Sequence, residues 1–300
     1  MDKFWSNRLM GIESMDTIRN LKFHKNSGNT FSHFLPIKAN QKILDVGCGT
    51  GSLTRGLYDW FNGDLTITGI DFDEGYIDYC KNIAKEKNYK IEYETGDINS
   101  LNYSNSLFDI SISSSVIEHV ENIQFFKEQF RILKNNGYII ILNVAGLKVY
   151  NGFMDEICPV TDEEKELRKE IVENVELNNR KNSNRFLMYR KPKHIWLKML
   201  EEYGFCNISH NIVKICYSTD NQLEDDFKKL IIDNLYSDDM DLIYAAKNNS
   251  RDDLLINKTN RFYTLINEKK NKRIELLRNG IKIWDYIDTD YNILTGQKVI

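Results

Sequence analysis

The amino-acid sequence predicts an α/β fold built around a parallel sheet. Residues 41–144 alternate between short apolar, β-branched runs and amphipathic helical stretches, which is the pattern of stacked βαβ units. Within this region an apolar run at 42–46 leads directly into a glycine-rich turn and a helix, as in nucleotide-binding sheets. No Gly/Ser-rich linker divides the chain, so we expect the later strands to join the same sheet.

Composition excludes several classes of protein. Of 300 residues, 41% are hydrophobic, which is enough for a large core. Forty Lys+Arg against 44 Asp+Glu give a net charge of −4, whereas a dedicated nucleic-acid binder is usually basic. The five cysteines form no C-x-x-C pair, and no metal-binding motif is present, so neither disulfides nor a metal site is expected. The N-terminus has no signal peptide and no apolar run reaches membrane-span length, which predicts a soluble, cytoplasmic protein.

The elements of residues 41–144 follow from hydrophobic periodicity. Strands are expected at Lys42–Val46, Leu65–Ile70, Lys90–Tyr93, Phe108–Ser113 and Tyr138–Val144. Helices are expected at Ser52–Phe61, Glu74–Lys87 and Asn122–Lys134. Asn136-Gly137 is a helix stop signal that ends the last of them.

The second half of the chain is richer in helices. Apolar residues recur on one helical face at 161–178, 194–203 and 221–236, and a polar helical region covers 251–279. Alternating strands follow Gly204 and cover Tyr291–Val299. We therefore expect helical insertions around late strands of one sheet. The expected organisation is a helical N-terminal cover (1–40), a cofactor-binding core (41–144), a lid insertion (145–191), a late helix and strand (192–218), a second helical insertion (219–288) and a final strand (289–300).

The glycine-rich turn is the most informative segment. Gly47, Gly49 and Gly51 alternate directly after an apolar strand and before a helix, so the backbone can turn tightly and approach a ligand closely. The expected ligand is nucleotide-like. The spacing is G-x-G-x-G with Ser52 next, and this departure from G-x-G-x-x-G disfavours an NAD-dependent dehydrogenase.

An acidic residue completes this pattern. Asp71 lies twenty residues after Gly51, at the end of the next strand. A doubly wound sheet brings the tips of its first two strands together over the ligand, where a carboxylate can accept both ribose hydroxyls. The alternative is a glycine turn that only packs a helix on a strand.

With these motifs the chain resembles the class I S-adenosylmethionine-dependent methyltransferases, in particular the branch of ubiquinone and menaquinone biosynthesis. The resemblance covers residues 41–144, about a third of the chain, and its motifs stand in the family's order. The resembling segments are Ile43–Gly51, Asp71, Thr95–Ile98, Phe108–Val120 and Arg131–Gly137. The last has Asn-Asn-Gly where the family usually has Pro-Gly-Gly.

The resemblance implies a Rossmann-like sheet of seven strands with the last antiparallel, and S-adenosylmethionine as cofactor, with S-adenosylhomocysteine as product. Asp45 is then expected near the methionine amino group, and Asp71 at the ribose. The remaining expected cofactor contacts are Gly47, Cys48, Gly49 and Gly51 through the main chain, Phe72, Asp97 and Ile98 at the adenine, and Ser113 and Ser114 at the methionine moiety or the substrate mouth.

The implied reaction is methyl transfer to a small-molecule acceptor, with an O- or N-nucleophile favoured. In-line displacement from a sulfonium mainly requires positioning and desolvation, which a lid over the strand ends would supply. His119, in the loop after the fourth strand, is the candidate general base, although it or Glu118 could equally cap the next helix.

Two other readings stay open. The chain could bind the cofactor without catalysing transfer and act as a regulator or partner. It could also methylate RNA or protein: a basic stretch at 180–193 offers an anionic partner six Lys or Arg residues, although the acidic balance makes nucleic acid an unfavoured partner. The sequence does not decide the oligomeric state.

Overall fold

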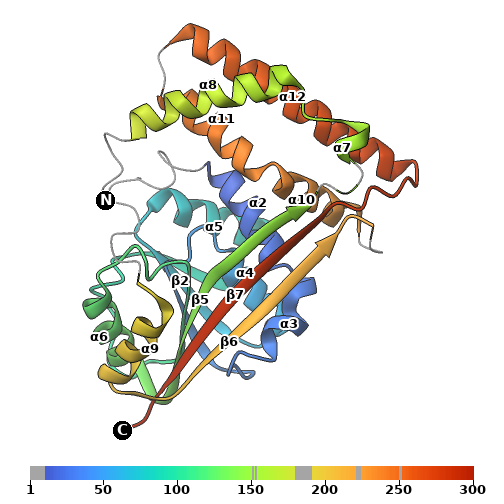
Figure 1. Cartoon of the computed structure of the whole chain (residues 1–300). Helices are drawn as coiled ribbons and strands as arrows, with labels where there is room; N and C mark the ends of the chain where they lie inside the picture. Colours follow the sequence, from blue (N-terminus) through green and yellow to red (C-terminus); the bar gives the residue numbers. More distant parts are fainter. Residues whose placement is uncertain (1–10, 151, 153, 180–190, 221–223, 250–251) are drawn as a thin grey trace.

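A seven-stranded, mostly parallel sheet forms the centre of the molecule (Figure 1). The computed structural model describes residues 11–150, 152, 154–179, 191–220, 224–249 and 252–300. The strand order is β3-β2-β1-β4-β5-β7-β6, and β7 runs antiparallel to both of its neighbours. The strands are β1 (Lys42–Val46), β2 (Thr66–Asp71), β3 (Ile91–Thr95), β4 (Phe108–Ser114), β5 (Leu133–Tyr150), β6 (Phe205–Ser218) and β7 (Tyr286–Lys298). This confirms the predicted fold class, including the antiparallel last strand.

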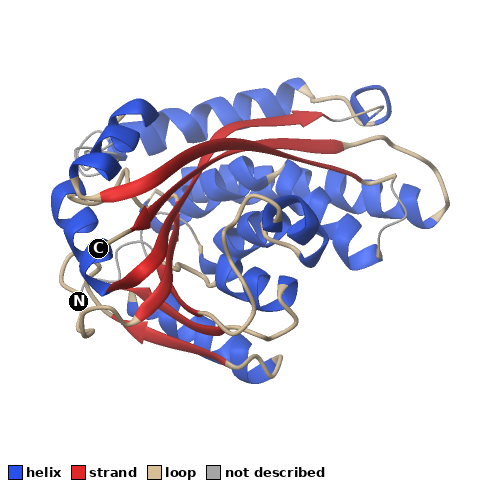
Figure 2. Cartoon of the chain, turned by 90° about the horizontal axis from the view of Figure 1, so that it is seen from below, coloured by secondary structure: helices blue, strands red, loops and turns tan. Residues whose placement is uncertain are grey.

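Helices cover both faces of this curved sheet (Figure 2). One face packs against the N-terminal segment, α4 and α10, and the other against α6 and α9. The helices of these layers are α2 (Ile12–Lys22), η1 (Lys25–Ser27), α3 (Gly28–Ser32), α4 (Ser52–Trp60), α5 (Glu74–Glu86), α6 (Asn122–Ile132), α9 (Lys193–Glu202) and α10 (Asp225–Leu235).

Alternation along β1 shows how the strands divide the core. Ile43 is fully buried against Leu57 of α4, whereas Leu44 and Val46 belong to the core under Phe126 of α6. Successive side chains of a strand point to opposite faces, so Asp45 lies on the same face as Ile43 and α4. The sequence of β1 therefore places a carboxylate beside the first turn of the helix that follows the glycine loop.

A helical cap forms a separate layer beyond the sheet (Figure 1). It consists of α8 (Asp162–Asn179), α11 (Ser237–Asn249) and α12 (Asp253–Arg278), with the short α7 (Met154–Ile157) nearby. Ile171, Ile243 and Phe262 are buried together between the three long helices. Ion pairs join α8 to α12, and a buried pair between Arg273 and Asp285, 2.8 Å long, fixes α12 to the segment before β7.

The observed elements differ from the expected ones at several boundaries. The helix predicted at Asn122–Lys134 ends at Ile132, because Leu133 turns to extended geometry and pairs with Phe108. The Asn136-Gly137 stop signal therefore lies inside β5. β5 and β7 are longer than predicted, since they pair with each other from Tyr138 to Tyr150 across a bulge. The helix α11 was not predicted at all. Among the residues described, no helix is both long and apolar enough to span a membrane.

Candidate active site

The glycine loop between β1 and α4 is built on left-handed backbone geometry. Gly47, Gly49 and Gly51 have φ of +70°, +55° and +77°, which side-chain-bearing residues rarely adopt. A Cβ on Gly47 would lie 2.6 Å from Val116, whereas a Cβ on Gly49 would meet no atom of the described residues within 4 Å apart from its chain neighbours. The loop is thus closed at its first glycine and open at its second, so a ligand can approach the backbone of Gly49.

Asp71 ends β2 directly beside this loop. Its carboxylate accepts hydrogen bonds from the Gly49 N–H at 2.9 Å and the Asp73 N–H at 3.0 Å. Burial raises the pKa of Asp71, which these two bonds partly oppose. Each carboxylate oxygen has a further lone pair, so Asp71 can accept two more donors from a ligand while it holds the loop.

Asp45 lies on the neighbouring strand and is fully buried. Its Oδ2 accepts a 2.6 Å hydrogen bond from the Thr54 hydroxyl in the first turn of α4. Burial raises the pKa of Asp45 to about 7, with the Thr54 bond and the nearby Arg19 acting in the opposite direction. A cationic ligand group here would favour the charged form of this carboxylate.

The end of β4 brings the predicted serines and the histidine to the same edge, since β4 is the other neighbour of β1. Ser113 is buried, and its hydroxyl has no hydrogen-bond partner among the described residues. His119 is partly buried in the following loop, and burial lowers its pKa from the usual 6.5. Glu118 accepts a 2.9 Å hydrogen bond from Asn143 of β5, so its carboxylate does not cap α6. That role belongs to Glu121.

The predicted adenine contacts are more dispersed. Phe72 is half-buried after β2, and Asp97 is exposed after β3, where its carboxylate accepts the Asn99 N–H at 2.8 Å. The Gly96 N–H donates to the Asp71 carbonyl at 2.9 Å, which keeps this loop beside the end of β2. Ile98, by contrast, packs into the core below the loop. The structure thus brings Asp97 and Phe72 to the edge and buries Ile98. Cys48 is also buried, and its side chain packs with Cys80 and Tyr93.

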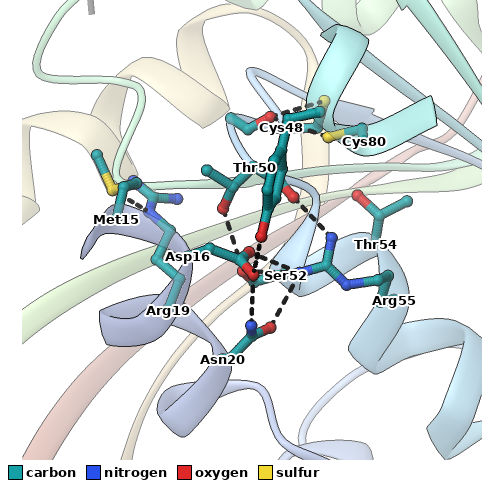
Figure 3. Close-up of polar contacts among 12 residues, drawn as sticks. Met15, Asp16, Arg19, Asn20, Cys48, Thr50, Ser52, Thr54, Arg55 and Cys80 are labelled. Atoms are coloured by element: carbon teal, nitrogen blue, oxygen red, sulfur yellow. Dashed lines mark hydrogen bonds and ion pairs between the residues drawn. The ribbon is translucent and has the colours of Figure 1, made fainter. Parts of the chain in front are cut away.

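A cation from α2 reaches this edge of the sheet (Figure 3). Arg19 donates to the Ser114 carbonyl at 3.3 Å and to the Met15 sulfur at 3.2 Å. It forms no ion pair with any carboxylate of the described residues, although it lies close enough to lower the pKa of Asp45 and Asp71. A guanidinium in this position can bind a carboxylate of a ligand.

Next to Arg19, a polar network joins α2 to the glycine loop (Figure 3). The buried carboxylate of Asp16 accepts hydrogen bonds from Arg55, Ser52 and Tyr79 at 2.6, 2.8 and 2.8 Å. Arg55 also donates to the Thr50 carbonyl within the loop at 2.7 Å. The network thus connects the N-terminal helix, the loop and the helices after β1 and β2.

The sequence analysis identified neither Asp16 nor Arg19 as site residues. Their partners outside α2 are more than 30 positions away in the chain, so no local spacing indicates them. Only the structure shows that Arg55 is one of the first six residues of α4, all of which are buried. A buried arginine needs an acidic partner.

The fold and this edge of the sheet define a Rossmann-like α/β protein with a nucleotide-type cofactor site. Within the described part of the chain, no three His, Cys, Asp or Glu side chains are grouped to hold a metal. Residues 37–204 match the model of the methyltransferase domain family, which is more than half of the chain. The chain therefore belongs to the methyltransferase domain family. The class predicted from the sequence, the class I S-adenosylmethionine-dependent methyltransferases, is confirmed.

Similar proteins agree with this assignment. The chain is 39% identical over 119 residues to the ubiquinone biosynthesis O-methyltransferase of Rickettsia canadensis, a match that covers 39% of this chain and 48% of that protein. It is 30% identical over 112 residues to the phosphoethanolamine N-methyltransferase of Triticum aestivum, covering 37% of this chain and 22% of that one. The matches thus span less than half the length of these relatives.

Solved structures show the same fold. The phosphoethanolamine N-methyltransferase 2 of Haemonchus contortus, determined in complex with S-adenosyl-L-methionine, superposes with a TM-score of 0.50 at 17% sequence identity. The alignment covers 92% of this chain and 53% of that one. At this identity the likeness concerns the fold, and the activity of the chain has to be argued from its own site.

Proposed function

We propose that this protein transfers the methyl group of S-adenosylmethionine to an oxygen or nitrogen atom of a small-molecule acceptor. One observation carries the proposal: the open backbone at Gly49 lies beside the Asp71 carboxylate, 2.9 Å from N to O, at the carboxyl edge of the sheet. This pairing suits an adenosine ligand, with the ribose hydroxyls at Asp71 and the backbone of the loop beneath.

The charges at this edge also suit the methionine half of the cofactor. Arg19 is available for a carboxylate, and Asp45 for an ammonium group. The buried Ser113 hydroxyl, which has no partner among the described residues, is a further donor on the same side. The positive side chain of Arg19 and the negative side chain of Asp45 suit the two charged groups of an amino acid better than a second nucleotide. This pair of charges therefore disfavours an NAD site.

When bound, S-adenosylmethionine supplies an electrophilic methyl group on a positively charged sulfur. The protein's own residues would hold the acceptor in line with that methyl carbon and exclude water. The bond from carbon to the acceptor forms as the bond from carbon to sulfur breaks, and a protonated acceptor loses its proton to a base. We assign that role to His119, which is neutral at pH 7 because its pKa is lowered.

Ligand-dependent stability tests the proposal directly. S-adenosylmethionine and S-adenosylhomocysteine should each raise the melting temperature, because both would bind the folded state alone, and NAD should not. A panel of phenols, alcohols and amines would then be screened for formation of S-adenosylhomocysteine. Binding without turnover on any acceptor would favour a regulatory protein, and an NAD response alone would overturn the proposal.

The basic stretch proposed for RNA lies mostly at 180–190, outside the described residues.

Replacing His119 by glutamine is expected to lower kcat about 100-fold or more with a protonated acceptor, the usual contribution of a general base. Because the pKa of His119 is lowered, the wild type should keep its rate on acidification through pH 6.5 and lose it only below. The measurement is initial rate against pH. The exposed His33 provides the matched control, His33→Gln. Full activity of His119→Gln would exclude the histidine as the base.

The pKa of Asp45 predicts a pH-dependent affinity. A ligand ammonium would favour the carboxylate, so binding should release a proton below pH 7 and tighten as the pH rises from 5.5 toward 7. Titration calorimetry of S-adenosylhomocysteine in buffers of different ionisation enthalpy measures this proton. In the ligand-free protein the same raised pKa acts against stability as the pH rises. The contribution of Asp45 to the free energy of unfolding falls as the pH increases from 4 to 7. Asp45→Asn should abolish the proton release, and a flat affinity in the wild type would contradict the assignment.

A further inference from the structure

The buried carboxylate of Asp16 joins α2 to α4 and α5. Asp16 accepts bonds from four side chains: Asn20 in α2, Ser52 and Arg55 in α4, and Tyr79 in α5. We propose that Asp16 is a positioning residue that docks α2 onto the glycine loop, so that Arg19 is in place only when this network is formed. The inference rests on the proposed function.

The orientation of α2 links Asp16 to Arg19. Asp16 and Arg19 are three residues apart in α2, so both project from one side of the helix. Asp16 contacts the helices that follow β1 and β2, while Arg19 reaches the Ser114 carbonyl at the end of β4. A single docked orientation of α2 therefore satisfies both contacts (Figure 3).

Asp16 also contacts the arginine that holds the glycine loop. Arg55 is 5% exposed, and Asp16 is its ion-pair partner at 2.6 Å. The same guanidinium donates to the Thr50 carbonyl, between Gly49 and Gly51. Without Asp16, a buried charge at the loop would lack its partner, which is costly in a low-dielectric site. Docking of α2 and the shape of the loop are therefore coupled through Arg55.

Other contacts also hold α2 in place. Leu21 is buried in the core on the sheet, Ser14 donates to Asp241 of α11 at 2.6 Å, and Asn234 of α10 donates to the Thr17 carbonyl at 3.0 Å. These contacts can persist when the Asp16 network is broken, so α2 would stay on α10 and α11 while its contact with the glycine loop is lost. Only a fraction of molecules would then be competent to bind, and the apparent Kd would rise by the inverse of that fraction.

The test combines affinity with a readout of docking that needs no ligand. Asp16→Asn should weaken S-adenosylhomocysteine binding by about 10- to 100-fold, the usual range for loss of a charge-assisted bond. It should raise KM for S-adenosylmethionine more than it lowers kcat, because saturating cofactor restores the docked state. Amide hydrogen exchange in α2 should be faster in the variant, and exchange in α12 unchanged.

Two further variants separate an effect on cofactor binding from a general loss of stability. Tyr79→Phe removes one neutral donor and keeps both charges, so it should fold even where Asp16→Asn does not, and should weaken binding by about 2- to 5-fold. Asp285→Asn is the matched control, because it breaks an equally buried pair with Arg273 at the cap. It should leave the Kd for S-adenosylhomocysteine unchanged.

A double-mutant cycle links Asp16 to Arg19. Arg19→Met should weaken binding by about tenfold in the wild type and by less than about threefold in the Asp16→Asn background. Additive effects, an unchanged Kd in Asp16→Asn, or an equal loss in Asp285→Asn would each overturn the inference. Failure of the wild type to bind S-adenosylhomocysteine would instead overturn the proposed function, while hydrogen exchange still decides whether Asp16 docks α2.

Discussion

Replacing Asp71 by alanine is expected to weaken binding of S-adenosylhomocysteine by at least about 100-fold, because two charge-assisted bonds to the ribose would be lost. Asp71 also accepts the Gly49 and Asp73 N–H groups, so the variant should lose about 1–3 kcal/mol of unfolding free energy. Titration calorimetry measures the first effect and chemical denaturation the second.

Asp109 provides the control for this prediction. It lies at the start of β4, at the opposite edge of the sheet, where it binds Lys134 at 2.9 Å. Asp109→Ala should lower stability without changing the affinity for S-adenosylhomocysteine. Asp71→Asn, which keeps the shape and part of the hydrogen bonding, should bind with an intermediate Kd. Wild-type affinity in Asp71→Ala would exclude this carboxylate from the cofactor site.

The elements that carry the cofactor edge could be predicted because their signals are local. β1 was predicted with its observed bounds, since an apolar strand, three glycines and a helix follow one another within a few positions. Asp71 follows from the same logic, as the acid at the tip of the neighbouring strand. Hydrophobic periodicity and turn chemistry are sufficient for such segments.

The elements that were missed depend on partners far away in the chain. β5 continues past Ala145 and Gly146, which look like a strand end, because β7 pairs with it about 140 positions later. Asp16 resembles any acidic residue of an amphipathic helix until Arg55 and Tyr79 are placed beside it. Such contacts are a property of the tertiary structure, and one sequence alone does not contain a local pattern for them.

The two halves of the proposed site also differ in this respect: one is built from local sequence patterns and the other from contacts between distant parts of the chain. The adenosine half depends on the glycine loop and Asp71, which are adjacent through strand pairing. The methionine half depends on Arg19, which only the docking of α2 brings to the end of β4. Affinity for adenosine alone should therefore be less sensitive to Asp16 than affinity for S-adenosylhomocysteine.

Gly49→Ala is expected to abolish cofactor binding with only a modest loss of stability. The residue has φ of +55°, so a side chain costs about 1–2 kcal/mol in backbone strain. Apart from its chain neighbours, a Cβ there meets no atom of the described residues within 4 Å, so no steric clash with them adds to this cost. The same Cβ would occupy the space through which the cofactor approaches the backbone. We expect the Kd for S-adenosylhomocysteine to rise by about 100-fold or more.

Gly280 provides the control for Gly49, because it also has a positive φ but lies outside the proposed cofactor site. Its φ is +74°, a Cβ on it also meets nothing within 4 Å, and it lies after α12 in the cap. Gly280→Ala should therefore lose a similar amount of unfolding free energy and bind S-adenosylhomocysteine as the wild type does. If the two variants lost stability equally and both kept their affinity, the open side of Gly49 would face solvent, and the cofactor would have to bind elsewhere on the carboxyl edge.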